Sequence, residues 1–80
     1  MIIVKIGRKA EMTQCERILQ YMDDFGSINN AQAFLDLGVA RLASRIHELR
    51  RSGVRIESET VYTHNRYGEI THYAVYRRTV

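Results

Sequence analysis

Apolar residues recur at helical spacing in three stretches of the chain. The first stretch, at about residues 13–25, carries its apolar positions three or four residues apart: Cys15, Ile18, Leu19, Met22 and Phe25. The run T-Q-C-E at its start fits a capping box, in which Thr13 and Glu16 each bind the other's backbone amide. Gly26 follows the last apolar position and is typical of a helix end. We therefore expect a helix over about 13–25.

The second stretch is shorter and covers about residues 30–37. Asn29 is a favourable N-cap, with Gln32 three residues later. Ala33, Phe34 and Leu37 supply the expected apolar face. A brief extended link at 27–28 joins this helix to the first, and Gly38 supplies the tight turn that follows it.

The third stretch runs from about Ala40 to Ser52 and ends at Gly53. Leu42, Ile46 and Leu49 lie at i, i+4 and i+7, the repeat of one helix face. A helix, a short turn with Gly and another helix together form the helix-turn-helix arrangement. We expect Val39 to pack between the two helices.

After Gly53 the period of the pattern changes from helical spacing to two. Val54, Ile56 and Ser58 alternate with charged residues, and a second β-rich segment covers about 70–78. The polar run 64–69 between them has Asn early and Gly late, as turns do. Two strands joined by a polar turn predict a hairpin, and a hairpin after a helix-turn-helix is a wing. The predicted fold class is therefore α+β, a winged helix-turn-helix with three helices followed by a two-stranded hairpin.

The first eleven residues form a separate unit in this scheme. Ile2, Val4 and Ile6 alternate as in a short strand, and Gly7 then interrupts the pattern. We treat 1–11 as an N-terminal arm or strand and 12–80 as the winged helix-turn-helix domain. An unpaired apolar strand attracts a partner, so this arm could pair with the wing or with a second copy of the chain.

Composition narrows the class of protein further. Eighty residues suffice for one small domain. The lone Cys15 excludes an internal disulfide, and neither Cys nor His residues occur at zinc-binding spacing. No stretch approaches the ~20 apolar residues that span a bilayer. We expect a cytoplasmic protein with no membrane segment, no metal and no cofactor.

The positive charge concentrates in one part of the chain. The net charge is only +3, but residues 39–55 carry five arginines against one glutamate, a net +4, whereas residues 12–38 sum to −3. Concentrated positive charge in and just after one helix is typical of a nucleic-acid footprint. A solvated helix face is the alternative interpretation of the same pattern.

Candidate DNA contacts on the third helix lie away from its apolar seam. At about 100° per residue, Arg41, Ser44 and Arg45 share another face of the helix with Glu48. Arginine suits phosphates and guanine edges, while Glu48 either accepts from cytosine or pairs with a nearby arginine. Arg51 near the helix end could bind phosphate or interact with the helix dipole.

Three further candidates lie outside the third helix. Asn30 stands at the start of the second helix, where backbone amides attract phosphate. Arg66 and Tyr67 occupy the predicted wing tip, suited to backbone or minor-groove contact. Helix capping and ordinary surface exposure are the competing interpretations of these positions.

The order of these motifs resembles a known family. The runs T-Q-C-E-R-I-L-Q-Y-M, L-G-V, R-I-H-E-L-R-R-S-G and N-R-Y-G-E resemble the small winged helix-turn-helix domains of bacteria and phages. The layout is also similar to the DNA-binding domain of the biotin repressor. The resemblance implies that the third helix enters the major groove. Such domains often have Ser or Thr where this chain has Ala40, to cap that helix.

Two functions remain in view from the sequence. The first is a double-stranded DNA-binding protein, a bacterial or phage transcriptional regulator or accessory factor without enzymatic activity. The second is a winged-helix module that binds another protein, since fold does not decide function. A homodimer is compatible with either.

Overall fold

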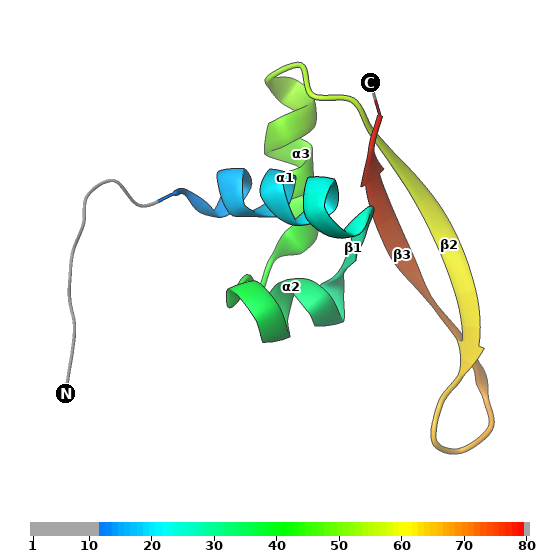
Figure 1. Cartoon of the computed structure of the whole chain (residues 1–80). Coiled ribbons are helices and arrows are strands. Elements are labelled where there is room, and N and C mark those ends of the chain that lie inside the picture. The colour runs from blue at the N-terminus through cyan, green and yellow to red at the C-terminus, as the bar shows by residue number, and fades with distance from the viewer. Residues whose placement is uncertain (1–11, 80) are drawn as a thin grey trace, which may run out of the picture.

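The computed structural model describes residues 12–79, so the predicted arm over 1–11 lies outside the described residues. Three helices pack against one end of a three-stranded antiparallel sheet (Figure 1). The elements in chain order are α1 (Gln14–Phe25), β1 (Ile28–Asn29), α2 (Asn30–Leu37), α3 (Leu42–Arg51), β2 (Ile56–His64) and β3 (Ile70–Arg78). The predicted winged helix-turn-helix fold is confirmed.

The capping box predicted at Thr13 is present, and the N-cap predicted at Asn29 is part of a second capping box. The Thr13 hydroxyl accepts from the backbone amide of Glu16 at 3.2 Å, and the Glu16 carboxylate accepts from the amide of Thr13 at 2.8 Å. Asn29 and Gln32 make the same exchange at the start of α2. Each box satisfies two backbone donors that would otherwise lack partners, which fixes where the helix begins.

The third helix begins later than the sequence predicted. It starts at Leu42 instead of Ala40, and Arg41 occupies its N-cap position without a side-chain cap. Gly38 ends α2 in the left-handed region, at φ 71°, and the Val39 side chain then enters the core with only 2% exposed. The turn therefore occupies residues 38–41, and the cap of α3 falls on Arg41 and not on Ala40.

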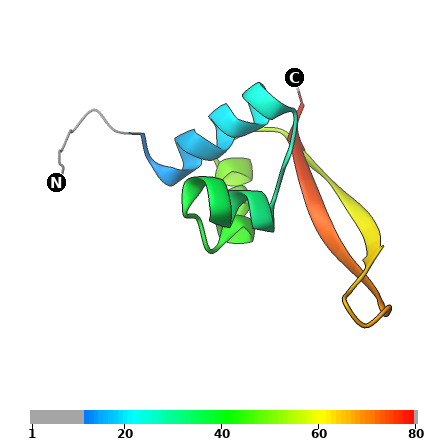
Figure 2. The ribbon, with the colours of Figure 1, turned by 60° about the horizontal axis from the view of Figure 1, so that its bottom comes forward.

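The sheet contains one strand that the hydrophobic pattern did not reveal. The link at 27–28 was expected to be extended, but Ile28 and Asn29 also pair with Tyr76 and Val75 of β3. Strand β3 is thus central, with β1 and β2 on its two sides. The long β2–β3 ladder runs from Ile56↔Arg78 to His64↔Ile70. Its far end extends beyond the helices, as both ribbon views show (Figure 2).

The core lies where the three helices meet the near end of the sheet. Its fully buried side chains come from every helix and from β1, and the largest are Ile18, Ile28, Val39, Leu42 and Ile46. The expectation that Phe34 supplies the buried face of α2 is wrong, because 60% of this residue is exposed. Ala33 and the half-buried Leu37 are sufficient to attach this eight-residue helix to the core.

Candidate nucleic-acid interface

Helix α3 has one buried and one open face. Leu42, Ile46 and Leu49 are at most 5% exposed and form the seam predicted from the sequence. At about 100° per residue, the positions opposite this seam are Ser44, His47 and Arg51. His47 and Arg51 are exposed and Ser44 is half-buried. His47 was not among the candidates predicted from the sequence, although its angular separation from the apolar seam indicates that it lies on the open face of α3.

Arg45 lies on the flank of α3 that turns toward α1. Its Nη2 donates to Glu48 Oε2 at 2.8 Å, and its Nε is buried without a hydrogen-bond partner. The other oxygen of Glu48 accepts from the Cys15 thiol of α1, at 3.6 Å. Of the two roles considered for Glu48, pairing with arginine is the one that the structure shows. The sequence suggested that Arg45 is a free cation on the open face of α3. In the structure it is instead paired with Glu48 on the flank of the helix.

The Cys15 thiol is affected by this arrangement. Partial burial raises the pKa of Cys15, and the hydrogen bond to Glu48 raises it further. The nearby Arg45 acts in the opposite direction but is outweighed. The neutral thiol is thus the favoured form, which suits a structural contact between α1 and α3 and not a nucleophile.

Arg50 has a structural role at the junction of α3 and β2. Its Nε and Nη2 both donate to the backbone oxygen of Ile56, at 3.2 and 2.9 Å. Its guanidinium also lies 6.0 Å from the centre of the Tyr76 ring. Arg50 therefore anchors the beginning of the wing to the end of the helix.

Three other arginines around α3 are exposed and form no ion pair with an acid of residues 12–79. Arg41 precedes the helix, Arg51 is its last residue, and Arg55 follows in the loop before β2. Arg55 was counted in the basic segment but was not selected as a site residue. The arginines at the start, end and exit of α3 are therefore the ones available to a polyanion.

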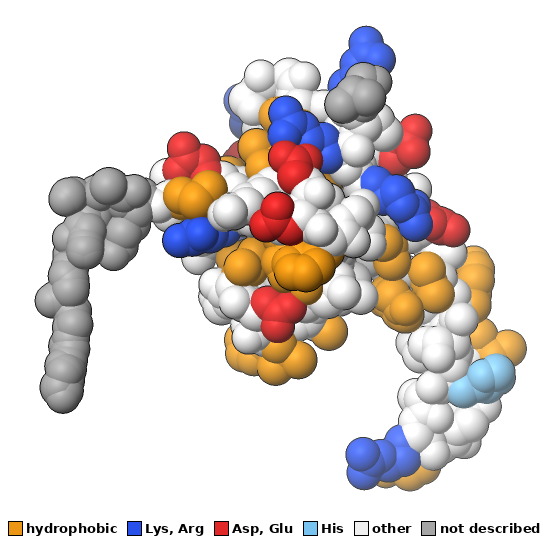
Figure 3. All heavy atoms as spheres, viewed as in Figure 1, with side chains coloured by type: hydrophobic (Ala, Val, Ile, Leu, Met, Phe, Trp, Pro, Cys, Tyr) orange, Lys and Arg blue, Asp and Glu red, His pale blue; other side chains and the backbone are white. Residues whose placement is uncertain are grey.

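The wing tip is a tight turn with its own hydrogen bonds. The side-chain oxygen of Asn65 accepts from the amides of Tyr67 and Glu69, at 2.9 and 3.0 Å. The backbone of Gly68 adopts φ 80°, a conformation that residues other than glycine rarely take. This turn presents Arg66 and Tyr67 to solvent, and 85% of Tyr67 is exposed. Figure 3 shows basic side-chain atoms, in blue, at this far end of the molecule.

The beginning of α2 lies beside the wing. Asn30 is exposed, while its neighbour Asn29 is occupied by the cap. Asn30 and Ala31 line a hollow together with Tyr73 of β3. Asn30 is therefore accessible between α2 and the hairpin, at the place where the sequence suggested a phosphate contact.

Within residues 12–79, no group of three or more His, Cys, Asp or Glu side chains is arranged to hold a metal ion. None of the helices in this part of the chain has the length and apolar character required to cross a bilayer.

The fold and this surface define a class of protein. Three helices with a glycine turn before the third, followed by an antiparallel hairpin, make a winged helix with an arginine-bearing third helix. Comparison with known protein families agrees, because the family model described as a winged helix-turn-helix domain matches residues 13–77 of this chain. The chain belongs to the winged helix-turn-helix domain family. Neither a curated protein nor a solved structure matches it.

Proposed function

We propose that this protein binds double-stranded DNA in a sequence-specific manner, as a bacterial or phage transcriptional regulator or accessory factor. In this proposal α3 enters the major groove, with Ser44 and His47 facing base edges. Arg41, Arg51 and Arg55 bind phosphates along the groove. The wing tip, with Arg66 and Tyr67, reaches the flanking backbone or minor groove.

The observation that carries the proposal is the distribution of arginines that no described acid neutralises. The arginines that do form ion pairs with described acids are Arg45, Arg77 and Arg78. Of the other described arginines, Arg17 lies on α1 and bonds to Gln20, and the rest lie at the two ends of α3, in the loop that follows it and at the wing tip. Family membership supports the same function, because the winged helix-turn-helix is a common DNA-binding fold.

The experiment is a titration of fluorescent random duplex with the full chain at low and moderate salt. We expect affinity to fall steeply between ~50 and ~200 mM salt, because phosphate contacts release counterions. Arg41→Ala and Arg51→Ala should each weaken binding and reduce the salt slope by about one. Arg77→Ala is the matched control. The guanidinium of Arg77 is already paired with Glu59 at 2.8 Å. Arg77 also points to the face of β3 opposite to its neighbour Tyr76, which packs against the core.

Sequence preference needs a second measurement. Bound duplexes selected from a random pool should converge on a consensus, and Ser44→Ala or His47→Ala should relax it at particular positions. Convergence on no sequence would contradict the sequence-specific part of the proposal and leave a general DNA-binding role.

One observation favours a second function, that of a protein-binding module. Phe34 and Leu35 of α2 are 60% and 78% exposed, and apolar side chains exposed together can mark a protein-interaction site. Absence of salt-sensitive DNA binding would favour this module. Phe34→Ser should then reduce partner binding and leave the fold intact.

A further inference from the structure

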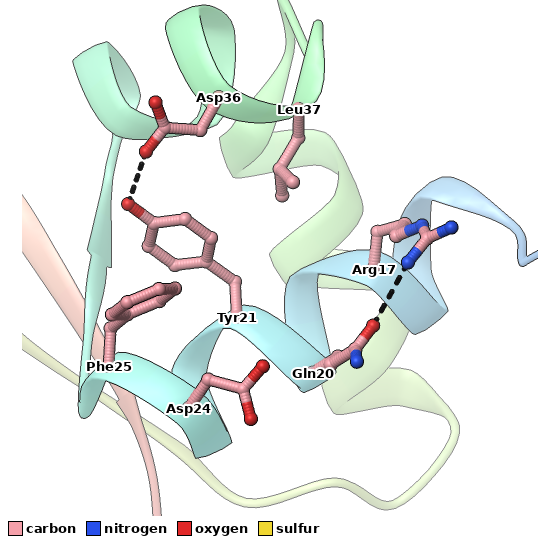
Figure 4. A pocket seen from close by; sticks show the side chains of 7 residues that line it. All are labelled: Arg17, Gln20, Tyr21, Asp24, Phe25, Asp36 and Leu37. Atoms are coloured by element: carbon pink, nitrogen blue, oxygen red, sulfur yellow. Dashed lines mark hydrogen bonds between the residues drawn. The ribbon is translucent and has the colours of Figure 1, made fainter.

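A groove runs between α1 and α2 on a face of the molecule that the proposed DNA interface does not use. It encloses about 340 Å³ and is lined by the outward side of α1 and by the end of α2 (Figure 4). Arg17 lies near the start of α1, Gln20 near its middle, and Asp24 and Phe25 near its end. None of the lining residues belongs to α3 or to the wing. We call this surface the α1–α2 groove.

The groove has an aromatic wall that is left uncovered. The Tyr21 and Phe25 rings lie 4.7 Å apart, and 70% of Phe25 is exposed. The Tyr21 hydroxyl donates to Asp36 of α2, which fixes the ring at the edge of the groove. In Figure 3, orange side chains over α1 and α2 alternate with red carboxylates on this face. An aromatic surface bordered by charges is typical of a protein–protein contact.

The charges along α1 are complementary to those of a second, antiparallel copy of the same helix. Arg17 and Asp24 are seven residues apart, so they lie on one stripe of the helix about 10 Å from each other. The midpoint between them falls at Gln20 and Tyr21. If a second α1 crosses antiparallel at this midpoint, Arg17 of each copy meets Asp24 of the other. This self-complementarity is what a two-fold interface requires.

We propose that the α1–α2 groove binds a second copy of this chain in a two-fold dimer, with the two α1 helices antiparallel. Burial of Tyr21 and Phe25 supplies most of the affinity, and the two Arg17–Asp24 pairs set the register. The dimer leaves the open face of α3 and the wing of each copy uncovered. It does not depend on DNA binding, so the two proposals can fail separately.

The test is a charge swap followed by sedimentation velocity, without DNA. The full chain should pass from monomer to dimer between ~10 and ~500 μM, the range of a micromolar association. Arg17→Asp and Asp24→Arg should each raise the dissociation constant about tenfold or more, because like charges then face each other. The double variant should recover the dissociation constant of the parent chain.

Folding does not confound these variants. Arg17 and Asp24 are exposed, and in the double variant an acid near the start and a base near the end of α1 favour the helix dipole. Arg66→Asp at the wing tip makes the same charge change as Arg17→Asp and should leave the dimer unaffected. The proposal is overturned if the chain stays monomeric, if the single variants dimerise like the parent, or if the swap does not restore association.

Discussion

Glu48 holds the guanidinium of Arg45 on the flank of α3, with Arg45 Nη2 and Glu48 Oε2 2.8 Å apart. The same carboxylate accepts from Cys15 of α1, so it connects two helices as well as two side chains. Glu48 engages only Nη2 of Arg45, but its carboxylate offsets the positive charge with which this arginine would attract a phosphate. Glu48 thus reduces the positive potential at the centre of α3, between Arg41 and Arg51, which pair with no acid of residues 12–79.

The first prediction concerns removal of this negative charge. Glu48→Gln should raise the affinity for any duplex several-fold at ~50 mM salt, since it frees Arg45 and cancels one repulsion with phosphate. Glu57→Gln changes the net charge equally but lies on β2. Titration of both variants with random duplex measures the effect. Equal affinity of the two variants would show that Glu48 does not restrain Arg45 during binding.

The second prediction separates the two neighbouring arginines at the end of α3. Arg50→Lys should lower the free energy of unfolding by about 1 kcal/mol, because an ammonium cannot make both bonds to the Ile56 oxygen. Arg51→Lys should leave stability nearly unchanged, since Arg51 is exposed and unpaired within residues 12–79. Thermal unfolding of both variants checks the difference. A similar loss in both would refute the anchoring role of Arg50.

The third prediction uses the missing cap of α3. Arg41→Ser offers a hydroxyl at the N-cap, so it should be more stable than Arg41→Ala by about 0.5–1 kcal/mol. Both variants lose the same cation and should weaken DNA binding equally. Chemical denaturation and duplex titration measure the two effects independently. If the serine variant is no more stable than the alanine variant, the backbone at φ −126° and ψ 63° does not admit a cap.

The fourth prediction concerns the wing tip. Asn65→Ala removes the acceptor for the amides of Tyr67 and Glu69, whose hydrogen exchange should become faster while exchange in the helices is unchanged. Asn65→Asp keeps the acceptor oxygens and should retain protection at both amides. Amide exchange followed by NMR gives the comparison. Unchanged exchange at 67 and 69 in the alanine variant would count against this role of Asn65.

The fifth prediction follows from the raised pKa of Cys15. The neutral thiol is favoured in the folded protein, so its contribution to stability is present at neutral pH and is lost as the pH rises past the folded-state pKa. The rate of alkylation should therefore reach its midpoint at a higher pH than in an unfolded peptide. Glu48→Gln should move this midpoint downward, because the carboxylate raises the pKa. A midpoint that is the same with and without Glu48 would contradict the thiol–carboxylate contact.

Local features of the fold were predictable because their physics is local. A capping box involves residues three positions apart, and the apolar seam of α3 repeats within one helix. The pair between Arg45 and Glu48 is also local and was among the alternatives considered. Its link to Cys15 was not predictable, since 33 residues separate the two side chains in the sequence.

Features decided by tertiary packing were missed or misplaced. Strand β1 has only two residues, too few for a period-two pattern, and it exists because β3 pairs with it. Helix α3 starts at Leu42 and not at Ala40, after a turn in which Val39 packs into a core that residues distant in the sequence complete. Phe34 has the right spacing for a core residue, but nothing in the described chain covers it.

The central position of β3 has a consequence for the order in which the domain can fold. Ile28 is fully buried and pairs with Tyr76, which follows it by 48 residues, so the edge of the sheet next to α2 cannot close until the last strand has been synthesised. The three helices precede β3 in the chain, so they are synthesised while this part of the core is still incomplete. We therefore expect closure of this long loop, and not formation of the helices, to limit the rate of folding. A nascent chain stalled before β3 would expose Ile28 to chaperones and proteases.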